Sequence, residues 1–181
     1  VTGYDVNDVR LDSLNMASSA AAAATGRDAV ITMLPDGGTL RQVASDIIPV
    51  MAAGSALIDC STVDVDSARD VAAMAGEAGL LAVDAPLSGG VGGARSGSLT
   101  FMAGGPDAGF ALAAPLFEIM GAKAVHCGGS GAGQAAKICN NMILGATMIV
   151  TCEAFALADG LGLDRQKMFV VVSTSSGYSW S

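Results

Sequence analysis

Residues 55–86 read SALIDCSTVDVDSARDVAAMAGEAGLLAVDAP, and this stretch decides the fold class. It begins and ends with short apolar runs, residues 55–61 and 80–86, which are typical of buried strands. Residues 66–78 between them have a helical composition and are long enough for a crossover helix. A strand, a crossover helix and a second strand predict two parallel neighbours in an α/β sheet.

The same alternation continues on both sides of this stretch. Further apolar runs lie at residues 29–35, 99–103 and 124–127, and segments of helical composition lie at residues 39–51 and 107–120. The pattern predicts a largely parallel sheet covered by helices. Ligands of such sheets bind beyond the carboxyl ends of the strands, so Pro35, Ser61, Thr62 and residues 86–90 mark the candidate site.

The rhythm changes after Gly133. Residues 134–158 contain no proline and no turn signal, which predicts one helix about 38 Å long that is suited to linking two domains. Gly160 and Gly162 are expected to end this helix. Residues 164–181 begin like another helix and stop without a closing element, so we expect a truncated carboxyl-terminal helical domain.

Composition excludes several classes of function. Nine Lys and Arg residues against seventeen Asp and Glu residues give a net charge of −8, which argues against a nucleic-acid groove and an anionic membrane surface. A single histidine, His126, and four scattered cysteines predict no metal site. The uncharged stretch at residues 138–152 contains two asparagines and is too short for a membrane span, so no membrane partner is expected.

Gly131, Gly133 and Ala136 match the dinucleotide-binding pattern G-x-G-x-x-A. The helix that they open does not return to a second strand, so a pyrophosphate site is the less favoured interpretation. Gly133, Lys137 and Asn141 instead share one helix face. A lysine in an apolar cleft is suited to acid–base chemistry because burial favours its neutral amine. The alternative is a lysine that extends along the surface with its amine in water.

Two further segments are candidates for ligand binding. Residues 84–90, Asp-Ala-Pro-Leu-Ser-Gly-Gly, follow a strand, and their glycines allow backbone amides to approach a carboxylate closely. A flexible glycine-rich turn is the alternative. Asp5 follows what reads as the second strand of a dinucleotide-binding sheet, where an acidic residue binds the ribose hydroxyls and disfavours a 2′-phosphate. A solvated aspartate in a turn is equally compatible with this position.

Together these motifs resemble the β-hydroxyacid dehydrogenase family over nearly the whole chain. The resemblance rests on segments at residues 33–35, 59–62, 84–90, 100–105 and 131–141. The closing segment, Ser175 to Trp180, reads Ser-Ser-Gly-Tyr-Ser-Trp and is most similar to members that act on 3-hydroxyisobutyrate. The sequence departs from the family in lacking the first strand and its glycine-rich loop. It also appears short between residues 5 and 29 and before Ile47, which suggests missing internal residues.

The resemblance implies a Rossmann-type sheet followed by a long interdomain helix and the start of an all-α domain. Residues 1–130 would form the NAD-binding domain, and residues 131–181 the long helix and the beginning of the helical domain. Lys137 would be the catalytic residue and NAD the cofactor. The remaining site residues implied are Ser88, Gly89, Gly90 and Asn141 for substrate and Asp5, Leu34, Pro35 and Thr62 for cofactor.

The activity implied is NAD-dependent oxidation of 3-hydroxyisobutyrate to methylmalonate semialdehyde in valine breakdown, with Lys137 as general acid and base. We also expect a homo-oligomer, a dimer or a tetramer, in a bacterial cytoplasm or in the mitochondrial matrix of a eukaryote. One alternative is a related reductase that uses NADPH on glyoxylate, succinate semialdehyde or tartronate semialdehyde. Another is a non-catalytic scaffold with the same fold.

Overall fold

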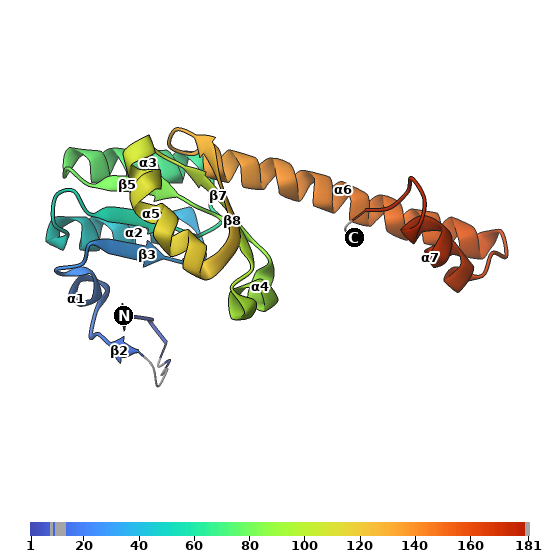
Figure 1. Ribbon diagram of the computed structural model, residues 1–181, viewed down its shortest axis with the longest axis horizontal. Coiled ribbons are helices and arrows are strands. Elements are labelled where there is room, and N and C mark those ends of the chain that lie inside the picture. Colours follow the sequence, from blue (N-terminus) through green and yellow to red (C-terminus); the bar gives the residue numbers. More distant parts are fainter. Residues whose placement is uncertain (8, 10–13, 180–181) are drawn as a thin grey trace. The chain divides into compact units, whose positions relative to one another are not determined.

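The computed structural model describes residues 1–7, 9 and 14–179, which divide into two compact units, Val1–Lys137 and Ile138–Ser181 (Figure 1). Trp180, which ends the segment that narrows the expected substrate, lies outside the described residues. The first unit holds the sheets and most of the helices. The second unit consists of helices, and the helix α6 runs from the first unit into it.

The main sheet of the first unit has the strand order β3-β4-β5-β7-β6, with β8 paired to β7. Its first three strands, β3 (Ala29–Thr32), β4 (Ala56–Asp59) and β5 (Leu81–Asp84), are parallel. In their register Thr32 faces Asp59, and Asp59 faces Asp84. The α/β class and the strand–helix–strand unit predicted from residues 55–86 are therefore confirmed.

The second half of the sheet differs from the prediction of a largely parallel arrangement. Strand β7 (Leu99–Gly104) is antiparallel to β5 and to β6 (Leu87–Ser88), and parallel to β8 (Gly121–Gly128). Only ten residues separate β6 from β7, and they include the short helix α4 (Gly90–Ser96). Parallel neighbours need a crossover of about a dozen residues or more, so this connection permits only an antiparallel return.

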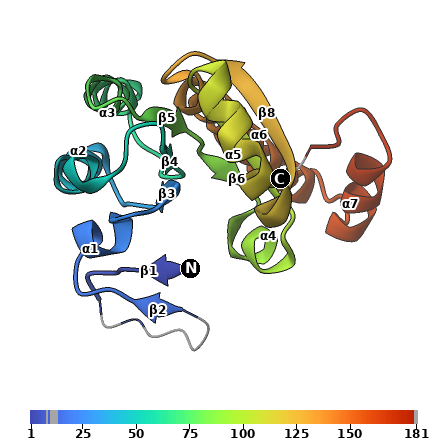
Figure 2. The same ribbon diagram turned by 60° about the vertical axis from the view of Figure 1, so that its left-hand side comes forward.

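Helices cover both faces of the sheet, as Figure 2 shows. Helices α2 (Gly37–Ile47), which a 3₁₀ turn extends, and α3 (Val65–Glu77) pack on one face, and α5 (Asp107–Met120) packs on the other. Strand β4 is buried along its whole length because its alternate side chains enter two different clusters. Leu57 joins the α2–α3 cluster, whereas Ala56 and Ile58 join the α5 cluster.

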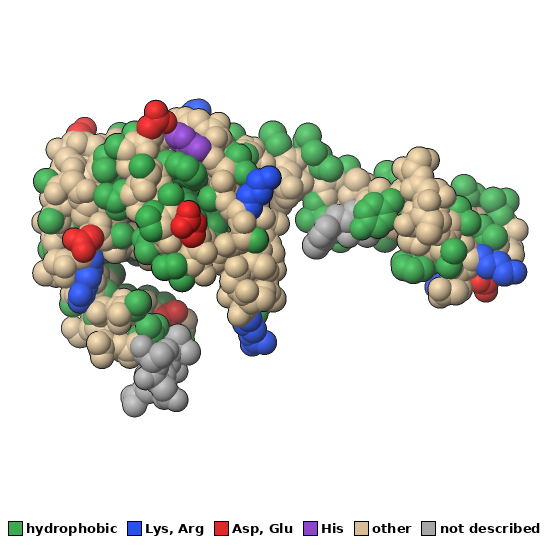
Figure 3. Space-filling view, in the orientation of Figure 1, with side chains coloured by type: hydrophobic (Ala, Val, Ile, Leu, Met, Phe, Trp, Pro, Cys, Tyr) green, Lys and Arg blue, Asp and Glu red, His purple; other side chains and the backbone are tan. Residues whose placement is uncertain are grey.

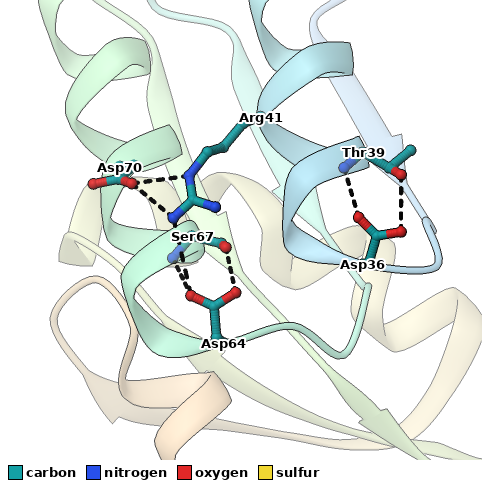
Figure 4. A network of polar contacts seen from close by, with 6 residues as sticks. All are labelled: Asp36, Thr39, Arg41, Asp64, Ser67 and Asp70. Atoms are coloured by element: carbon teal, nitrogen blue, oxygen red, sulfur yellow. Dashed lines mark hydrogen bonds and ion pairs between the residues drawn. The ribbon is translucent and has the colours of Figure 1, made fainter.

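Polar contacts fix the packing of α2 against α3 (Figure 4). The Arg41 guanidinium donates to the Asp70 carboxylate at 2.9 Å, and the Ser67 amide donates to the Asp64 carboxylate at 2.8 Å where α3 begins. The Ser67 hydroxyl also bonds to Asp64 and lowers the pKa of this carboxyl group. A side chain at Gly37 would collide with Ser67, so glycine is required where the two helices meet.

The amino-terminal residues form a small structure of their own. Strands β1 (Thr2–Gly3) and β2 (Asn15–Met16) pair in parallel as a two-stranded sheet, and the short helix α1 (Ala20–Ala24) follows. Strand β3 is the edge of the main sheet on the described part of the chain. The expected strand end before Asp5 is therefore present, in a sheet separate from the main one.

Helix α6 (Ala132–Gly160) confirms the long helix expected at residues 134–158, and α7 (Arg165–Ser173) confirms the helix expected after residue 164. Figure 3 shows hydrophobic side chains along the surface of α6. Its exposed large apolar residues are Ile138, Met142, Ile143, Met148, Ile149, Val150 and Leu157. By length and composition α6 could cross a membrane, so the prediction that the apolar stretch around residues 138–152 is too short for a span is wrong. Long apolar helices of soluble proteins meet the same criterion.

The core on the α5 face centres on a pair of stacked aromatic rings. Phe117 is buried and lies on Phe101 with ring centroids 4.6 Å apart. We expect Phe117→Ala to lower the free energy of unfolding by about 3–5 kcal/mol, because it removes buried area and leaves a cavity. Urea denaturation measures this loss. Ile119→Ala, an exposed site on the same helix, is the control and should change it by less than about 0.5 kcal/mol. Equal losses would contradict this assignment of the core.

Candidate functional site

The carboxylate of Asp84, at the end of β5, is buried against the beginning of α6. Its two oxygens accept hydrogen bonds from the amides of Gly131 at 2.7 Å and Gln134 at 2.9 Å. The first amides of a helix have no partner within the helix and carry partial positive charge, so they suit a carboxylate. Burial raises the pKa of Asp84, and the bonds from the two amides oppose that rise.

The side chain of Gln134 attaches the same helical turn to the loop after β4. It is completely buried, and its nitrogen Nε2 donates to the Ser61 carbonyl at 2.8 Å. Its oxygen Oε1 accepts from the Val63 amide at 3.1 Å. Both polar atoms of this buried amide are therefore satisfied, and the start of α6 is held to the ends of two neighbouring strands.

Two glycines allow α6 to begin so close to the sheet. A Cβ atom on Gly133 would lie 2.5 Å from the Asp84 carbonyl oxygen, and one on Gly104 would lie 2.6 Å from the Gly133 amide nitrogen. The motif Gly131-x-Gly133 therefore serves helix–sheet contact. Because Asp84 takes its amides, the motif cannot also bind a pyrophosphate, which agrees with the interpretation that was less favoured from the sequence.

Lys137 lies one turn further along α6. Its Nζ donates to the Leu87 carbonyl at 2.7 Å, and its side chain is half-buried. Burial lowers the pKa of this amine from its ordinary value. A solvated surface lysine would lack both features. Since Leu87 directly precedes Ser88, the structure brings Lys137 to the segment predicted to bind substrate.

The residues after Leu87 form a defined turn. Gly89 and Gly90 have φ angles of +124° and +58°, which residues with a side chain rarely adopt. Gly90 is the first residue of α4. The flexible turn considered from the sequence is thus an ordered loop followed by a helix. The Ser88 hydroxyl is half-buried and, within the described part of the chain, forms no hydrogen bond.

Three of the predicted cofactor residues lie at the carboxyl ends of β3 and β4. The Leu34 amide donates to the Ser61 hydroxyl oxygen at 2.8 Å, so the two strand ends are joined. Pro35 and Thr62 are the exposed residues that follow. The Ser61 hydroxyl in turn donates to the buried carboxylate of Asp59 at 2.6 Å, and burial raises the pKa of Asp59.

The other two predicted site residues, Asp5 and Asn141, take no part in the hydrogen bonds described above. Asp5 is exposed next to the small β1–β2 sheet, and its carboxylate accepts from the amide and side chain of Asn7 at 2.8 Å and 3.0 Å. This arrangement matches the alternative considered from the sequence, a solvated aspartate in a turn. Asn141 belongs to the second unit, where it is exposed and accepts from Asn140 at 3.4 Å.

Sequence reasoning gave no role to Asp84, Gln134 or the Leu87 carbonyl. A signal existed for Asp84, because an acidic residue that ends a buried strand needs several donors, and Gly131-x-Gly133 offers helix amides without side chains. Gln134 carried the weaker signal of a polar residue in an apolar helix. The Leu87 carbonyl has no side-chain signature and was not identifiable.

Comparisons with known proteins bear on this geometry. Residues 1–129 match the family model described as the NAD binding domain of 6-phosphogluconate dehydrogenase. The chain belongs to the β-hydroxyacid dehydrogenase family. Residues 131–181 match a second family model, described as NAD-binding of NADP-dependent 3-hydroxyisobutyrate dehydrogenase. Both models describe nicotinamide-dinucleotide domains, and the second includes α6, which assigns this apolar helix to a dehydrogenase domain.

Several similar proteins are named 3-hydroxyisobutyrate dehydrogenase. The chain is 48% identical over 168 residues to the 3-hydroxyisobutyrate dehydrogenase of Pseudomonas aeruginosa, and the alignment covers 91% of this chain and 56% of that protein. It is 46% identical over 169 residues to the mitochondrial enzyme of Mus musculus, covering 92% and 50%. The solved structure of the Mycobacterium tuberculosis enzyme with L-serine aligns with a TM-score of 0.88 at 44% identity, covering 92% and 57%. The chain spans about half the length of the curated relatives it matches.

The environment of Lys137 predicts how its amine titrates. Because burial lowers its pKa, we expect the midpoint for labelling of Lys137 by acetic anhydride, followed by mass spectrometry, to lie below the ordinary lysine value of about 10.4. The denatured protein is the control, in which Lys137 should titrate near that ordinary value. Identical midpoints in the folded and denatured protein would refute the buried position of the amine.

Proposed function

We propose that this protein is an NAD-dependent 3-hydroxyisobutyrate dehydrogenase with Lys137 as its proton-transfer residue. One observation carries the proposal: the half-buried Lys137 amine is bonded to the Leu87 carbonyl, directly before Ser88. A lysine with a lowered pKa beside a glycine turn suits a reaction that moves an alcohol proton. Relatives at 45–48% identity that bear this name support the substrate assignment.

The residues present fit a dinucleotide cofactor. The parallel strands β3 and β4 end together at Thr32 and Asp59, and a bond from Leu34 to Ser61 joins the residues that follow. Sheets of this kind bind dinucleotides at this edge. Leu34, Pro35 and Thr62 would line the cofactor site there, and the Asp5 carboxylate would accept hydrogen bonds from the ribose hydroxyls. When bound, the nicotinamide ring supplies the acceptor for the electron pair that leaves the substrate carbon.

The chain's own residues would manage the proton. A neutral Lys137 that donates one hydrogen to the Leu87 carbonyl keeps its lone pair free, so it can take the proton of the substrate hydroxyl. In the reverse direction the ammonium returns that proton. Exclusion of water around the amine favours the neutral form and makes this exchange accessible at lower pH.

The remaining predicted residues would hold the substrate. The Ser88 hydroxyl and the amides of Gly89 and Gly90 would bind its carboxylate, since glycine has no side chain to shield its backbone amide. Asn141 would orient the hydroxyl end of the substrate. No protein cation is needed nearby if these donors act together.

We place the boundary of the proposed domains where the two family models meet. Residues 1–130 would be the NAD-binding domain, and residues 131–181 the long helix and the beginning of a helical domain. The partner is a small hydroxyacid, with no nucleic acid and no membrane, and the active form is a dimer or tetramer. Bacterial and mitochondrial relatives fit a bacterial cytoplasm or a mitochondrial matrix.

Replacing Lys137 tests the proposal directly. In the full-length protein Lys137→Ala should lower the turnover of 3-hydroxyisobutyrate by about 100-fold or more, which is the contribution typical of general acid–base catalysis. Lys137→Arg should not restore it, because the guanidinium resists deprotonation. The exposed Lys123 offers a matched control, and Lys123→Ala should keep wild-type turnover. Normal turnover in Lys137→Ala would remove the assignment.

The lowered pKa of Lys137 sets the direction of the pH dependence. Oxidation needs the neutral amine, so its kcat/KM should rise with pH and level off at a pH below the ordinary lysine value of about 10.4. Reduction of the semialdehyde needs the ammonium and should fall over the same range. Steady-state rates measured in both directions give the two profiles, and profiles with the same slope in both directions would exclude a single proton-transfer group.

A related reductase that uses NADPH is the second candidate, since the family model for residues 131–181 is named for an NADP-dependent enzyme. The cofactor preference separates the two. We expect NAD to be preferred, and Asp5→Ala to reduce kcat/KM for NAD by about 10-fold or more through loss of charged hydrogen bonds to the ribose. Glu77→Ala, at another exposed acidic residue, is the control. A wild-type preference for NADP would favour the reductase.

A further inference from the structure

The Asp84 carboxylate lies at the amino terminus of α6, in the position where many helices bind an anionic ligand. The residue is 6% exposed, and its carboxylate accepts hydrogen bonds from the amides of Gly131 and Gln134. Among the residues that the structure describes, it forms no ion pair, so helix amides provide the principal compensation for its burial. The charge of Asp84 is thus used within the fold to hold one particular helical turn.

The same extended segment contacts α6 a second time. Three residues after Asp84, the Leu87 carbonyl accepts from Lys137, which itself lies three residues after Gln134. The segment from Asp84 to Leu87 therefore runs beside the first turns of α6 and binds it at two points. Any displacement of the first point moves the Lys137 amine relative to Leu87 and Ser88.

Gln134 provides an independent restraint on the same turn. Its buried side chain bonds to Ser61 and Val63 beyond β4, whereas its backbone amide bonds to Asp84 at the end of β5. Two strand ends therefore fix the translation and the rotation of α6 at this residue. The glycine contacts at Gly104 and Gly133 leave no space for the helix to move inward.

We propose that Asp84 and Gln134 are positioning residues, which hold the first turn of α6 so that the Lys137 amine stays bonded to Leu87 and shielded from water. The proposal deepens the proposed function, on which its catalytic meaning rests. Neither residue needs to touch substrate or cofactor. Their contribution to the reaction is the location of the amine, and a displacement of about 1 Å can cost 100-fold in rate.

The test uses two variants of the full-length protein that loosen the turn by different means. Asp84→Asn removes a charge and places an amide NH₂ against backbone amides. Gln134→Met keeps the side-chain volume and loses both bonds to the loop after β4. Lys137 should gain water in both variants, so its labelling midpoint should move to higher pH by about half a unit or more. We expect kcat for 3-hydroxyisobutyrate to fall about 10-fold or more, and the rising limb of its pH profile to move to higher pH with the labelling midpoint.

The direction of the shift distinguishes positioning from a direct charge effect. Loss of the Asp84 charge by itself would disfavour the ammonium and move the Lys137 midpoint to lower pH. Gln134→Met changes no charge and should still move it to higher pH. Ser67→Ala is the control for general destabilisation, because Ser67 is fully buried where α2 meets α3 and its hydrogen bonds are to Asp64. It should leave the midpoint unchanged.

An unshifted or lowered midpoint in either folded variant overturns the proposal. If Asp84→Asn does not fold, as judged by circular dichroism, the Lys137 labelling midpoint in Gln134→Met alone tests the proposal. The labelling measurement does not depend on turnover. Should Lys137→Ala retain activity, the proposed function fails, while the labelling midpoints still decide whether Asp84 and Gln134 position the amine.

Discussion

Asp84 brings a carboxylate into the middle of the sheet, and the amides at the start of α6 make its burial tolerable. The burial of a carboxylate without hydrogen-bond donors costs several kcal/mol of folding free energy, and it favours the neutral form of the group. The two amide bonds give Asp84 partners, and Asp84 gives unpaired helix amides an acceptor. The helix amides and the carboxylate therefore satisfy each other, and this contact fixes the first turn of α6 on the sheet of the first unit.

The two halves of the proposed site are near each other because of this contact. Residues 84–90 continue from the buried carboxylate into the glycine turn, and residues 131–137 continue from the bonded amides to the lysine amine. Each segment follows its own regular geometry away from the contact. Backbone structure thus decides where the Lys137 side chain begins relative to the turn, and the bond to the Leu87 carbonyl holds the amine there.

The sequence predicted the elements that have a strong period. Helix α5 begins and ends where it was expected, at Asp107 and Met120, and the three parallel strands lie within their predicted apolar runs. The antiparallel return of β7 was not predicted, because apolar alternation carries no information on strand direction. Helix α4 was missed because its three glycines favour turns, and its contact with β7 could not be read from the sequence.

The residues of the proposed site also fall into two groups, those with a signal in the sequence and those without one. Lys137 and the turn from Ser88 to Gly90 could be found because side chains of recognisable chemistry occur in apolar surroundings. The anchoring role of Asp84 needed knowledge of which helix begins above which strand, and a carbonyl such as that of Leu87 leaves no mark in a sequence. Long-range pairing of backbone groups was therefore the missing information.

The close approach of α6 to the sheet also limits how the protein can be adapted to heat. Exchange of helical glycines for alanine is a common route to thermostability, since it reduces the freedom of the unfolded chain by about 0.4–1 kcal/mol per site. Gly133 is closed to that route because backbone atoms fill the space of a methyl group. Gly76, near the end of α3 with open space around it, accepts the exchange. Engineering for stability would thus begin on α3 and leave the first turn of α6 untouched.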